Sequence, residues 1–526
     1  MKALLLALAI AGAEPLTEAV LLLSGAACVE ELDASEMERY RTLHEHPLPL
    51  NGCSRSRLTS TGLLTRYQTA SLEDYRRRNG DILSFAELAL VDGFNAEIAE
   101  ALKQFFTLEG TLEGGKWRRL EGSVSTKYSA GGAWGIKSRW TLDGKWEMSA
   151  GNKSWSAALY GKRHLGKLAA GDLNARFGQG LLMWNGFTLS GYSSISAFSR
   201  NACGVSTCSS YTSEGHLRGV AADLCFGNWT VTALGSFDGN TALGNVTRSG
   251  KTATFGATVL VKDVMETLQS RAAGNTGATA TLGASADFRF SLPAVAIFGE
   301  AGYVSGEWRG IAGAIWTPVY KTSLAVKGVW ADTRGIALGA QAGWVFASLD
   351  GSTKDGKFTG KSRLQLSPEI KLGELTLKPS LLWQERYRPY EENRWRSDLR
   401  ADADASVGPW TLHLRANAVK CAGYAFAGYA EGGFKKDNFG CYLRGGLFRA
   451  DDWEDRIYVY ERDVPGNFNV PARYGRGWWT SLYTSLKFRA LKCRHTLGLR
   501  LGATVYEKSS GKEPKLELKM QYSLNL

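Results

Sequence analysis

The chain has 526 residues, of which 44% are hydrophobic and 22% charged, with 61 glycines and a formal net charge of +12. Beyond roughly the first ten residues, no apolar run approaches the length of a membrane-spanning helix, which disfavours a helical membrane protein. A transmembrane β-barrel escapes that test, because each of its strands is apolar on one face only.

The first 13 residues have the features of a secretory signal peptide. Lys2 precedes a short apolar core that ends in an Ala-x-Ala pattern, so we expect residues 1–13 to be removed and the mature chain to begin at Glu14. A second apolar run, residues 19–27, stops at Cys28 and leaves a lipoprotein signal as the alternative. Both interpretations predict an exported protein.

Eight cysteines are spread along the chain without a CxxC pair, which disfavours a zinc site. In an exported protein an even number of cysteines permits disulfides. Two candidate pairs would each close a local loop, Cys28 with Cys53 and Cys203 with Cys208. The other four cysteines can be explained as small side chains on strand faces.

Motifs that carry catalysis are missing from the sequence. The six histidines are scattered, without an HExxH motif or a triad-like spacing, and there is no G-x-S-x-G elbow. We therefore expect no enzyme and no bound metal or cofactor.

Between residues 14 and 110 the spacing of apolar residues is helical. Residues 14–50 contain two candidate helices and an extended linker with two prolines. Residues 51–110 contain two helix pairs, each joined by a tight hairpin, with Asn79-Gly80 as the helix stop between them. The pattern predicts a small, all-α N-terminal domain.

This segment resembles the tandem helix-hairpin-helix domain of competence-type (ComEA-like) DNA-binding proteins. The matching pieces are Tyr75-Arg76, the pattern Phe85-x-x-Leu88-x-x-Val91-x-Gly93 and the helix through Ala101. The resemblance implies hairpins whose backbone N–H groups hold a DNA phosphate. The glycine pattern is only half kept, since Asn95 occupies the place of a second glycine. The candidate nucleic-acid-binding residues are Gly62, Arg66, Arg76, Arg77, Arg78, Gly93 and Asn95.

Charge argues against that role. Residues 14–110 hold sixteen Asp and Glu against nine Lys and Arg, a net charge of −7, whereas a DNA-binding module usually has a basic face. Arginines 76–78 would also stabilise a helix end through its dipole. A protein-docking or structural module is thus the competing hypothesis. The chain from residue 111 onward carries about +18, which indicates either a basic lumen or cations at lipid headgroup level.

From residue 117 onward the pattern has a period of two, as in β-strands. Residues 515–526 alternate without a break, and twelve residues at about 3.3 Å each reach roughly 40 Å, enough to cross a bilayer at a tilt. We expect this segment to close a barrel, with Lys515, Glu517 and Lys519 toward the lumen and the alternate apolar residues toward lipid.

Residues 117–526 are therefore predicted to form a large antiparallel transmembrane β-barrel, so that the chain is mainly β. We count about 20 candidate strands and allow 18 to 22, because residues 335–347 could hide further strands. Short turns alternate with long connections at 199–214, 239–275 and 449–474, as between periplasmic turns and external loops. A soluble propeller would show a repeat, and none is found. An even number of strands predicts that the helical domain lies on the periplasmic side.

Two Gly-rich segments, 176–187 and 455–477, resemble segments of Bacteroidetes outer-membrane proteins that join a helix-hairpin-helix module to a barrel. That family implies no activity for this chain, and we expect both segments to pack inside the lumen. Two functions fit the sequence. One is a porin-like scaffold or pore in the outer membrane, in contact with its lipid, whose periplasmic module docks a protein partner. The other is an outer-membrane protein for DNA binding or uptake.

Overall fold

The computed structural model describes residues 15–108, 120–129, 133–142, 145–161, 164–189, 191–208, 215–238, 240–263, 281–372, 375–465, 467–491, 493–508 and 512–525. The expected signal peptide lies outside these residues. No helix within the described ranges is long and apolar enough to cross a bilayer.

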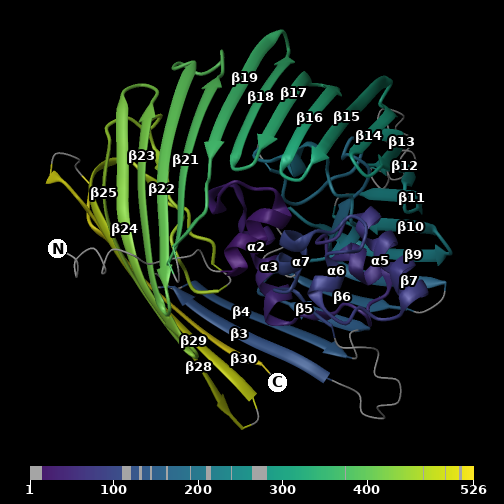
Figure 1. Ribbon diagram of the computed structural model, residues 1–526, viewed down its shortest axis with the longest axis horizontal. Helices are drawn as coiled ribbons and strands as arrows, with labels where there is room; N and C mark the ends of the chain where they lie inside the picture. Colours follow the sequence, from purple (N-terminus) through teal and green to yellow (C-terminus); the bar gives the residue numbers. More distant parts are fainter. Residues whose placement is uncertain are drawn as a thin grey trace, which may run out of the picture.

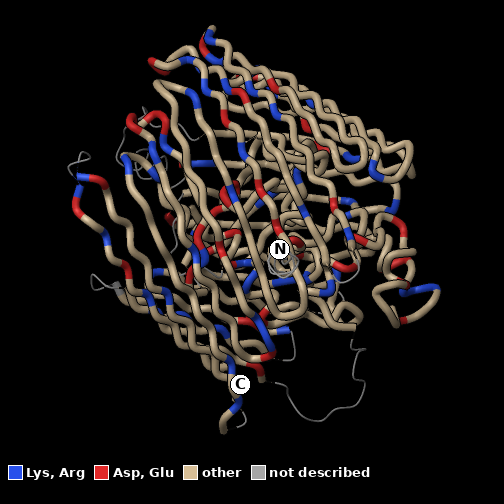
Figure 2. The backbone as a smooth tube through the Cα atoms, turned by 60° about the vertical axis from the view of Figure 1, so that its left-hand side comes forward, with Lys and Arg blue, Asp and Glu red and all other residues tan. Residues whose placement is uncertain are grey.

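Twenty-four antiparallel strands of the described chain close into a barrel (Figure 1). The last strand, β30 (Lys515–Asn525), pairs with the first, β3 (Leu120–Ser129), and Figure 2 shows the strands side by side and tilted. The other wall strands are β4 (Ala133–Leu142), β5 (Trp146–Ala150), β6 (Trp155–Tyr160), β7 (Leu165–Arg176), β9 (Leu217–Phe226), β10 (Trp229–Ser236), β11 (Thr241–Ser249), β12 (Ala253–Lys262), β13 (Thr281–Ser291), β14 (Val295–Val304), β15 (Glu307–Val319), β16 (Thr322–Trp330), β17 (Arg334–Ala342), β18 (Val345–Lys354), β19 (Lys357–Leu366) with its continuation β20 (Ile370–Leu372), β21 (Leu375–Tyr387), β22 (Trp395–Val407), β23 (Trp410–Lys420), β24 (Tyr424–Lys436), β25 (Phe439–Ala450), β28 (Gly475–Ala490) and β29 (Cys493–Tyr506).

The predicted number of strands was too low. Strands β11 and β12 occupy most of the segment 239–275, which was expected to be a long loop, and β17 and β18 occupy the region around 335–347 where hidden strands were allowed. Their polar and apolar faces differ too little to stand out in the sequence. In β11, for example, Leu243 points inward and Gly244 is exposed on the outside.

The outer face of the wall is apolar, as the alternation predicted. In β17 the side chains of Ile336 and Leu338 are exposed on the outside, whereas Ala337 between them is buried inside. The closing strand follows the expected faces, with Met520 outward and Lys519 inward, where its ammonium contacts Asp463 at 2.6 Å. An outward apolar band of this kind suits a wall surrounded by lipid.

Residues 15–108 fold into a compact helical unit, here called the plug. It contains α2 (Pro15–Ser24), η1 (Val29–Glu31), α3 (Ala34–Glu45), β1 (Leu48–Pro49), α4 (Arg55–Ser60), α5 (Arg66–Asn79), α6 (Phe85–Leu88), α7 (Ala96–Leu102) and β2 (Phe106–Thr107). The purple and blue helices in Figure 1 lie inside the ring of strands. The plug packs against the inner face of the wall, and its expected position on the periplasmic side stays a prediction.

The plug has an apolar core of its own. Leu50, Leu58, Leu72, Leu102 and Phe105 are fully buried in one cluster made of plug residues. Strands β1 and β2 pair in parallel and tie the two halves of the unit together, because they come from distant parts of its sequence. The two predicted helix pairs are present, α4 with α5 and α6 with α7.

Two further segments fold into the lumen, as expected for the Gly-rich loops. The first inner loop, residues 177–201 apart from residue 190, contains η2 (Ile195–Phe198) and leads to β8 (Gly204–Thr207), which pairs with β7. The second inner loop, residues 455–473 apart from residue 466, contains β26 (Ile457–Tyr458) and β27 (Ala472–Arg473). The lumen thus holds three parts of the chain.

Candidate functional site: the plugged lumen

Charged side chains of opposite sign line the seam between the plug and the wall. Carboxylates of the plug meet Lys and Arg side chains that come from the wall strands and their turns. The pairs are Glu18–Lys378, Glu30–Arg400, Glu30–Arg415, Glu31–Arg363, Glu36–Arg176, Glu38–Lys137, Asp92–Lys251 and Glu97–Lys321. Arg57 of the plug forms a pair of reverse polarity with Glu147 of β5, at 2.6 Å. The negative charge of the plug therefore faces positive charge of the wall.

Glu30 of η1 is the centre of the densest group. One of its oxygens accepts hydrogen bonds from Arg415 of β23 and from the backbone N–H of Tyr460 at 2.9 Å, and the other lies 3.2 Å from Arg400 of β22. Asp402 contacts the same two arginines, at 2.6 Å and 2.5 Å. Two buried guanidinium groups are thus neutralised by one carboxylate of the wall and one of the plug.

Two of the plug carboxylates, Glu30 and Glu36, are held in their charged form. Burial alone would raise the pKa of Glu30, but Arg415 and Arg400 outweigh it and hold that pKa well below its usual value. Burial likewise opposes ionisation of Glu36, and Arg39 with Arg176 nevertheless lowers its pKa. Each carboxylate consequently favours the docked state at neutral pH.

His46 at the end of α3 is buried as the neutral imidazole. Its Nε2 lies 3.2 Å from the hydroxyl of Ser123 on β3. Burial, and then the neighbouring charges of Arg139 and Lys137, lower its pKa to about 3. This part of the seam therefore disfavours a positive charge on the plug.

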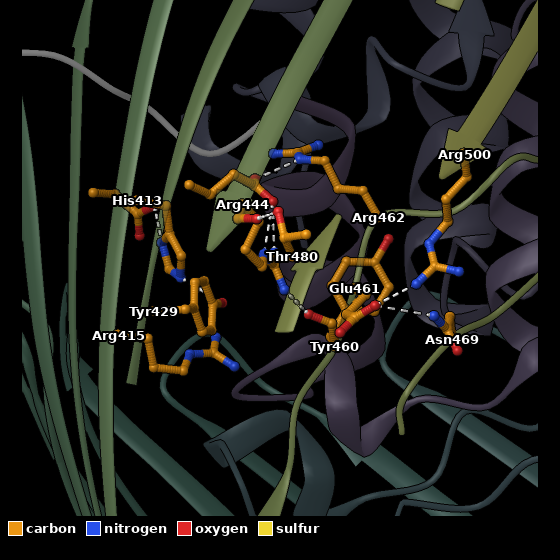
Figure 3. Close-up of polar contacts among 12 residues, drawn as sticks. His413, Arg415, Tyr429, Arg444, Tyr460, Glu461, Arg462, Asn469, Thr480 and Arg500 are labelled. Atoms are coloured by element: carbon orange, nitrogen blue, oxygen red, sulfur yellow. Dashed lines mark hydrogen bonds and ion pairs between the residues drawn. The ribbon is translucent and has the colours of Figure 1, made fainter. Parts of the chain in front are cut away.

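The second inner loop is held by a charged network of its own (Figure 3). Glu461 is buried and pairs with Arg500 of β29. Arg462, the next residue, contacts Glu431 of β24 at 2.7 Å, and Arg444 of β25 reaches the same carboxylate at 2.7 Å. These contacts fix the loop to the wall from β24 to β29.

The three inner segments together contact the inner face around the barrel. The plug pairs with β4, β5, β7, β19 and β21 to β23, as described above. The first inner loop covers the stretch between them: Phe198 packs against Ala325 and Ala337, and the backbone N–H groups of Gln179 and Leu181 donate to Glu300 of β14. The second inner loop covers β24 to β29. The three segments thus contact the wall at several places around the described lumen.

The candidate nucleic-acid-binding residues do not form one surface. The carbonyl of Gly62 accepts a hydrogen bond from Asn201 of the first inner loop at 3.1 Å, and Arg66 donates to the carbonyl of Ala202 at 3.0 Å. Gly93 packs against the ring of Tyr67 and accepts from Gln68.

The remaining candidates serve mainly the plug itself. Asn95 caps α7 by accepting from the N–H of Ile98, and Arg76 donates to the carbonyl of Asn51. Only Arg77 and Arg78 of the set have exposed side chains, and Arg78 pairs with Asp74. DNA binding stays a prediction.

The expected disulfides are not formed, since all eight cysteines are free thiols in the structure. Cys203 and Cys208 flank the extended strand β8, which separates them by roughly 16 Å at about 3.3 Å per residue, far beyond disulfide reach. Cys28 lies near Arg400 of β22, whereas Cys53 lies near Arg57 and Glu147 on another side of the lumen. Among the described residues no group of three or more His, Cys, Asp or Glu could hold a metal ion.

The wall residues of the seam were not identified from the sequence. Arg363, Arg400 and Arg415 each occupy an inward position on a strand whose neighbouring residues point to lipid. The signal was present, because an Arg on the polar face of a transmembrane strand must face the lumen. What the alternation could not reveal is the carboxylate that each one meets.

A closed wall with an apolar outer face and a charged, occupied lumen defines the class: a transmembrane β-barrel with an internal plug. No family model matches the chain, and no curated protein matches it. Among solved structures, OccK10 (OpdN) of Pseudomonas aeruginosa is 10% identical, over 78% of this chain and 98% of that one, with a TM-score of 0.33. OprD of Pseudomonas aeruginosa is 8% identical, over 78% and 95%, with a TM-score of 0.32. A BenF-like porin from Pseudomonas fluorescens Pf-5 is 8% identical, over 78% and 99%, also with 0.32. TM-scores this low do not support the assignment of any property of those proteins to this chain.

Proposed function

We propose that this protein is an outer-membrane channel that its own N-terminal plug closes from within, and that it conducts when the plug is displaced. The observation that carries the proposal is the character of the seam. The buried core residues of the plug all come from the plug, with Phe187, Leu189, Tyr460 and Phe468 of the inner loops packed against them. Its contacts with the wall strands are dominated by ion pairs. A unit whose buried core comes from its own residues can leave such a seam without losing that core.

Buried ion pairs suit a seam that opens. Removing two charges from water costs much of what their attraction returns, so a set of such pairs specifies one docked position without stabilising it as strongly as apolar packing would. A permanent filling of the lumen would be served better by apolar contacts of the kind that Phe198 makes with the wall.

The same contacts limit where a soluble partner could dock on the plug. Seven of its carboxylates already face cations of the wall, and the candidate hairpin at Gly62 lies against the first inner loop. Binding of a periplasmic protein or of DNA through these groups would therefore require displacement of the plug first.

A reversible covalent lock tests the proposal. The hydroxyl of Ser56 in α4 lies 3.4 Å from the thiol of Cys225 on β9, so the substitution Ser56→Cys places two thiols across the seam at near-disulfide distance. Single channels of the full-length S56C protein are recorded in planar bilayers, first oxidised and then reduced. We expect oxidation to abolish large openings and reduction to restore them.

Two controls isolate the lock. The native chain is recorded under the same oxidation, which exposes effects of its own cysteines, and S56C combined with Cys225→Ser lacks the partner thiol. Both should open regardless of redox state. Equal conductance of oxidised and reduced S56C, with the disulfide shown to be formed, would refute displacement of the plug. Absence of conductance in every reduced sample would refute a channel.

A further inference from the structure

A cavity of about 1080 Å³ lies between the plug and the wall at strands β13 to β21. Its lining comes from α2 and α3 of the plug, from the first inner loop and from the inner face of the wall. Tyr320 and Lys321, in the turn between β15 and β16, lie at its edge with exposed side chains, so the cavity reaches solvent at that end of the barrel.

Three cations in this lining have no carboxylate within ion-pair distance among the described residues. Lys327 of β16 is only 6% exposed, and its ammonium lies 5.6 Å from the ring centroid of Tyr192. Arg289 of β13 donates to the hydroxyls of Ser199, at 2.7 Å, and Ser291. Arg200 of the first inner loop donates to the carbonyl of Gln179 at 3.2 Å. In the contacts just described, each of the three cations touches only uncharged groups.

The three carboxylates that line the cavity are already engaged. Glu18 pairs with Lys378, Glu97 with Lys321 and Glu36 with both Arg39 and Arg176. Glu300, the acid that acts on Arg200 from a distance, accepts instead from the hydroxyl of Ser285 and two backbone N–H groups of the first inner loop. The lining as a whole therefore carries an uncompensated positive charge.

Unsatisfied polar groups border the same space. The hydroxyl of Ser193 is buried and has no hydrogen-bond partner, and neither has the amide oxygen of Gln365. Buried polar atoms without partners are rare in folded proteins and each calls for an explanation, such as a bound molecule that completes the hydrogen bonds.

We propose that this cavity binds an organic oxyanion, a carboxylate or phosphate on an apolar body. Arg200, Arg289 and Lys327 supply the charge, and the hydroxyl of Ser193 supplies a donor. Much of the remaining lining is apolar, including Ile195 and Phe346, and the volume suits a whole organic molecule, because ligand pockets commonly measure about 300 to 1,000 Å³. Part of the lining belongs to the plug, so the site is complete while the plug is in place, and binding does not require the plug to move.

A buried, unpaired Lys327 has a cost in the empty protein, because desolvation of a charge destabilises the folded state. Its replacement by an apolar side chain of similar length should therefore stabilise the protein while it weakens binding. A residue that serves packing alone would show the opposite sign, with a loss of stability. This opposition separates a ligand-binding role of Lys327 from a structural one.

Isothermal titration of the full-length protein in detergent micelles tests the site with four probes: phenyl phosphate, phenylacetate, inorganic phosphate and phenol. We expect one of the two aromatic anions to bind one per chain, and the preferred one to identify the oxyanion. Phenol and inorganic phosphate should bind at least tenfold more weakly, because each lacks either the charge or the apolar body.

Lys327→Met should lower that affinity ten- to hundredfold, as expected for the loss of a charged hydrogen bond, and should raise the unfolding temperature of the empty protein. Arg289→Gln should weaken binding similarly, and Lys354→Met, at the exposed end of β18, should leave it unchanged. The proposal is overturned if neither aromatic anion binds, if phenol or inorganic phosphate binds equally well, or if Lys327→Met binds as the native protein does.

Discussion

Glu30→Gln tests the ion-pair seam at its centre. The amide can still accept from the N–H of Tyr460, so the shape of the contact is retained and only the charge is lost. Arg400 and Arg415 then share the single carboxylate of Asp402, which leaves one buried guanidinium uncompensated. Breaking a buried pair in this way costs about 3 to 5 kcal/mol, and the remaining Asp402 suggests the lower end, so release of the plug should become roughly a hundredfold more frequent.

Hydrogen exchange of the full-length protein in lipid measures this release. Amides of α3 and α5 should exchange about two orders of magnitude faster in the variant, while amides of the wall strands should not change. The control is Glu100→Gln, which removes an exposed pair with Lys103 at 3.4 Å and should change exchange little. Unchanged exchange in the plug, or equal acceleration in the plug and the wall, would refute a separable seam.

Two further changes probe other parts of the lumen. The docked plug favours the neutral imidazole of His46, whose pKa is lowered to about 3 from an unfolded value of 6.5. This preference stabilises the docked plug above pH 6.5, and the stabilisation is lost as the pH falls. Between pH 8 and pH 5 the loss amounts to about 2 kcal/mol. Exchange of α3 should accelerate accordingly, and His46→Gln should flatten the pH profile; an identical profile in the variant would contradict the assignment. In Gly339→Ala the new Cβ would lie 2.5 Å from the ring of Phe198, so η2 should be displaced at a cost of about 1 to 3 kcal/mol, visible as faster exchange of the first inner loop. Ala340→Val, on the outward face of the same strand, should have no such effect, and an unperturbed loop in Gly339→Ala would show that Phe198 does not anchor it.

The strands of the barrel follow from local sequence wherever one face is clearly apolar. The closing strand is such a case, since its outward residues include Leu516, Met520 and Tyr522 and its inward ones are polar. Strand β17 was not predicted because its inward positions, Gly335, Ala337 and Gly339, are small rather than polar. Phe198 of the first inner loop packs against Ala337 and Gly339. Where the first inner loop packs against the wall, the inward positions are therefore small, and the alternation of polar and apolar residues is lost.

The position of the plug could not follow from local pattern at all. Helix periodicity correctly located α5 and α7, but it contains no information about what surrounds a helix. The relevant signal was global: a segment with a net charge of −7 precedes a barrel with about +18. Opposite charges of this size favour association. In the structure they form ion pairs between the plug and the wall, such as Glu31 with Arg363 and Glu38 with Lys137.

The same charges determine what an open channel would select. The inner loops continue into wall strands at both ends, and contacts such as Phe198 with Ala337 and Glu461 with Arg500 do not involve the plug. Displacement of the plug alone would therefore leave the loops in place and strip the wall cations of their carboxylates. A lumen lined by Arg363 and Lys378 without their plug carboxylates concentrates anions.

We thus expect the open state to be anion-selective. In a planar bilayer with a tenfold KCl gradient, the reversal potential of the large openings of the reduced S56C protein should have the sign of chloride permeation. Arg363→Gln should shift that potential toward zero, and Lys354→Gln, at the exposed end of β18, should change it far less. A cation-selective open state would mean that the plug carries the wall's cations with it or that conduction follows another path, and the separation of plug and loops inferred from their contacts would be wrong.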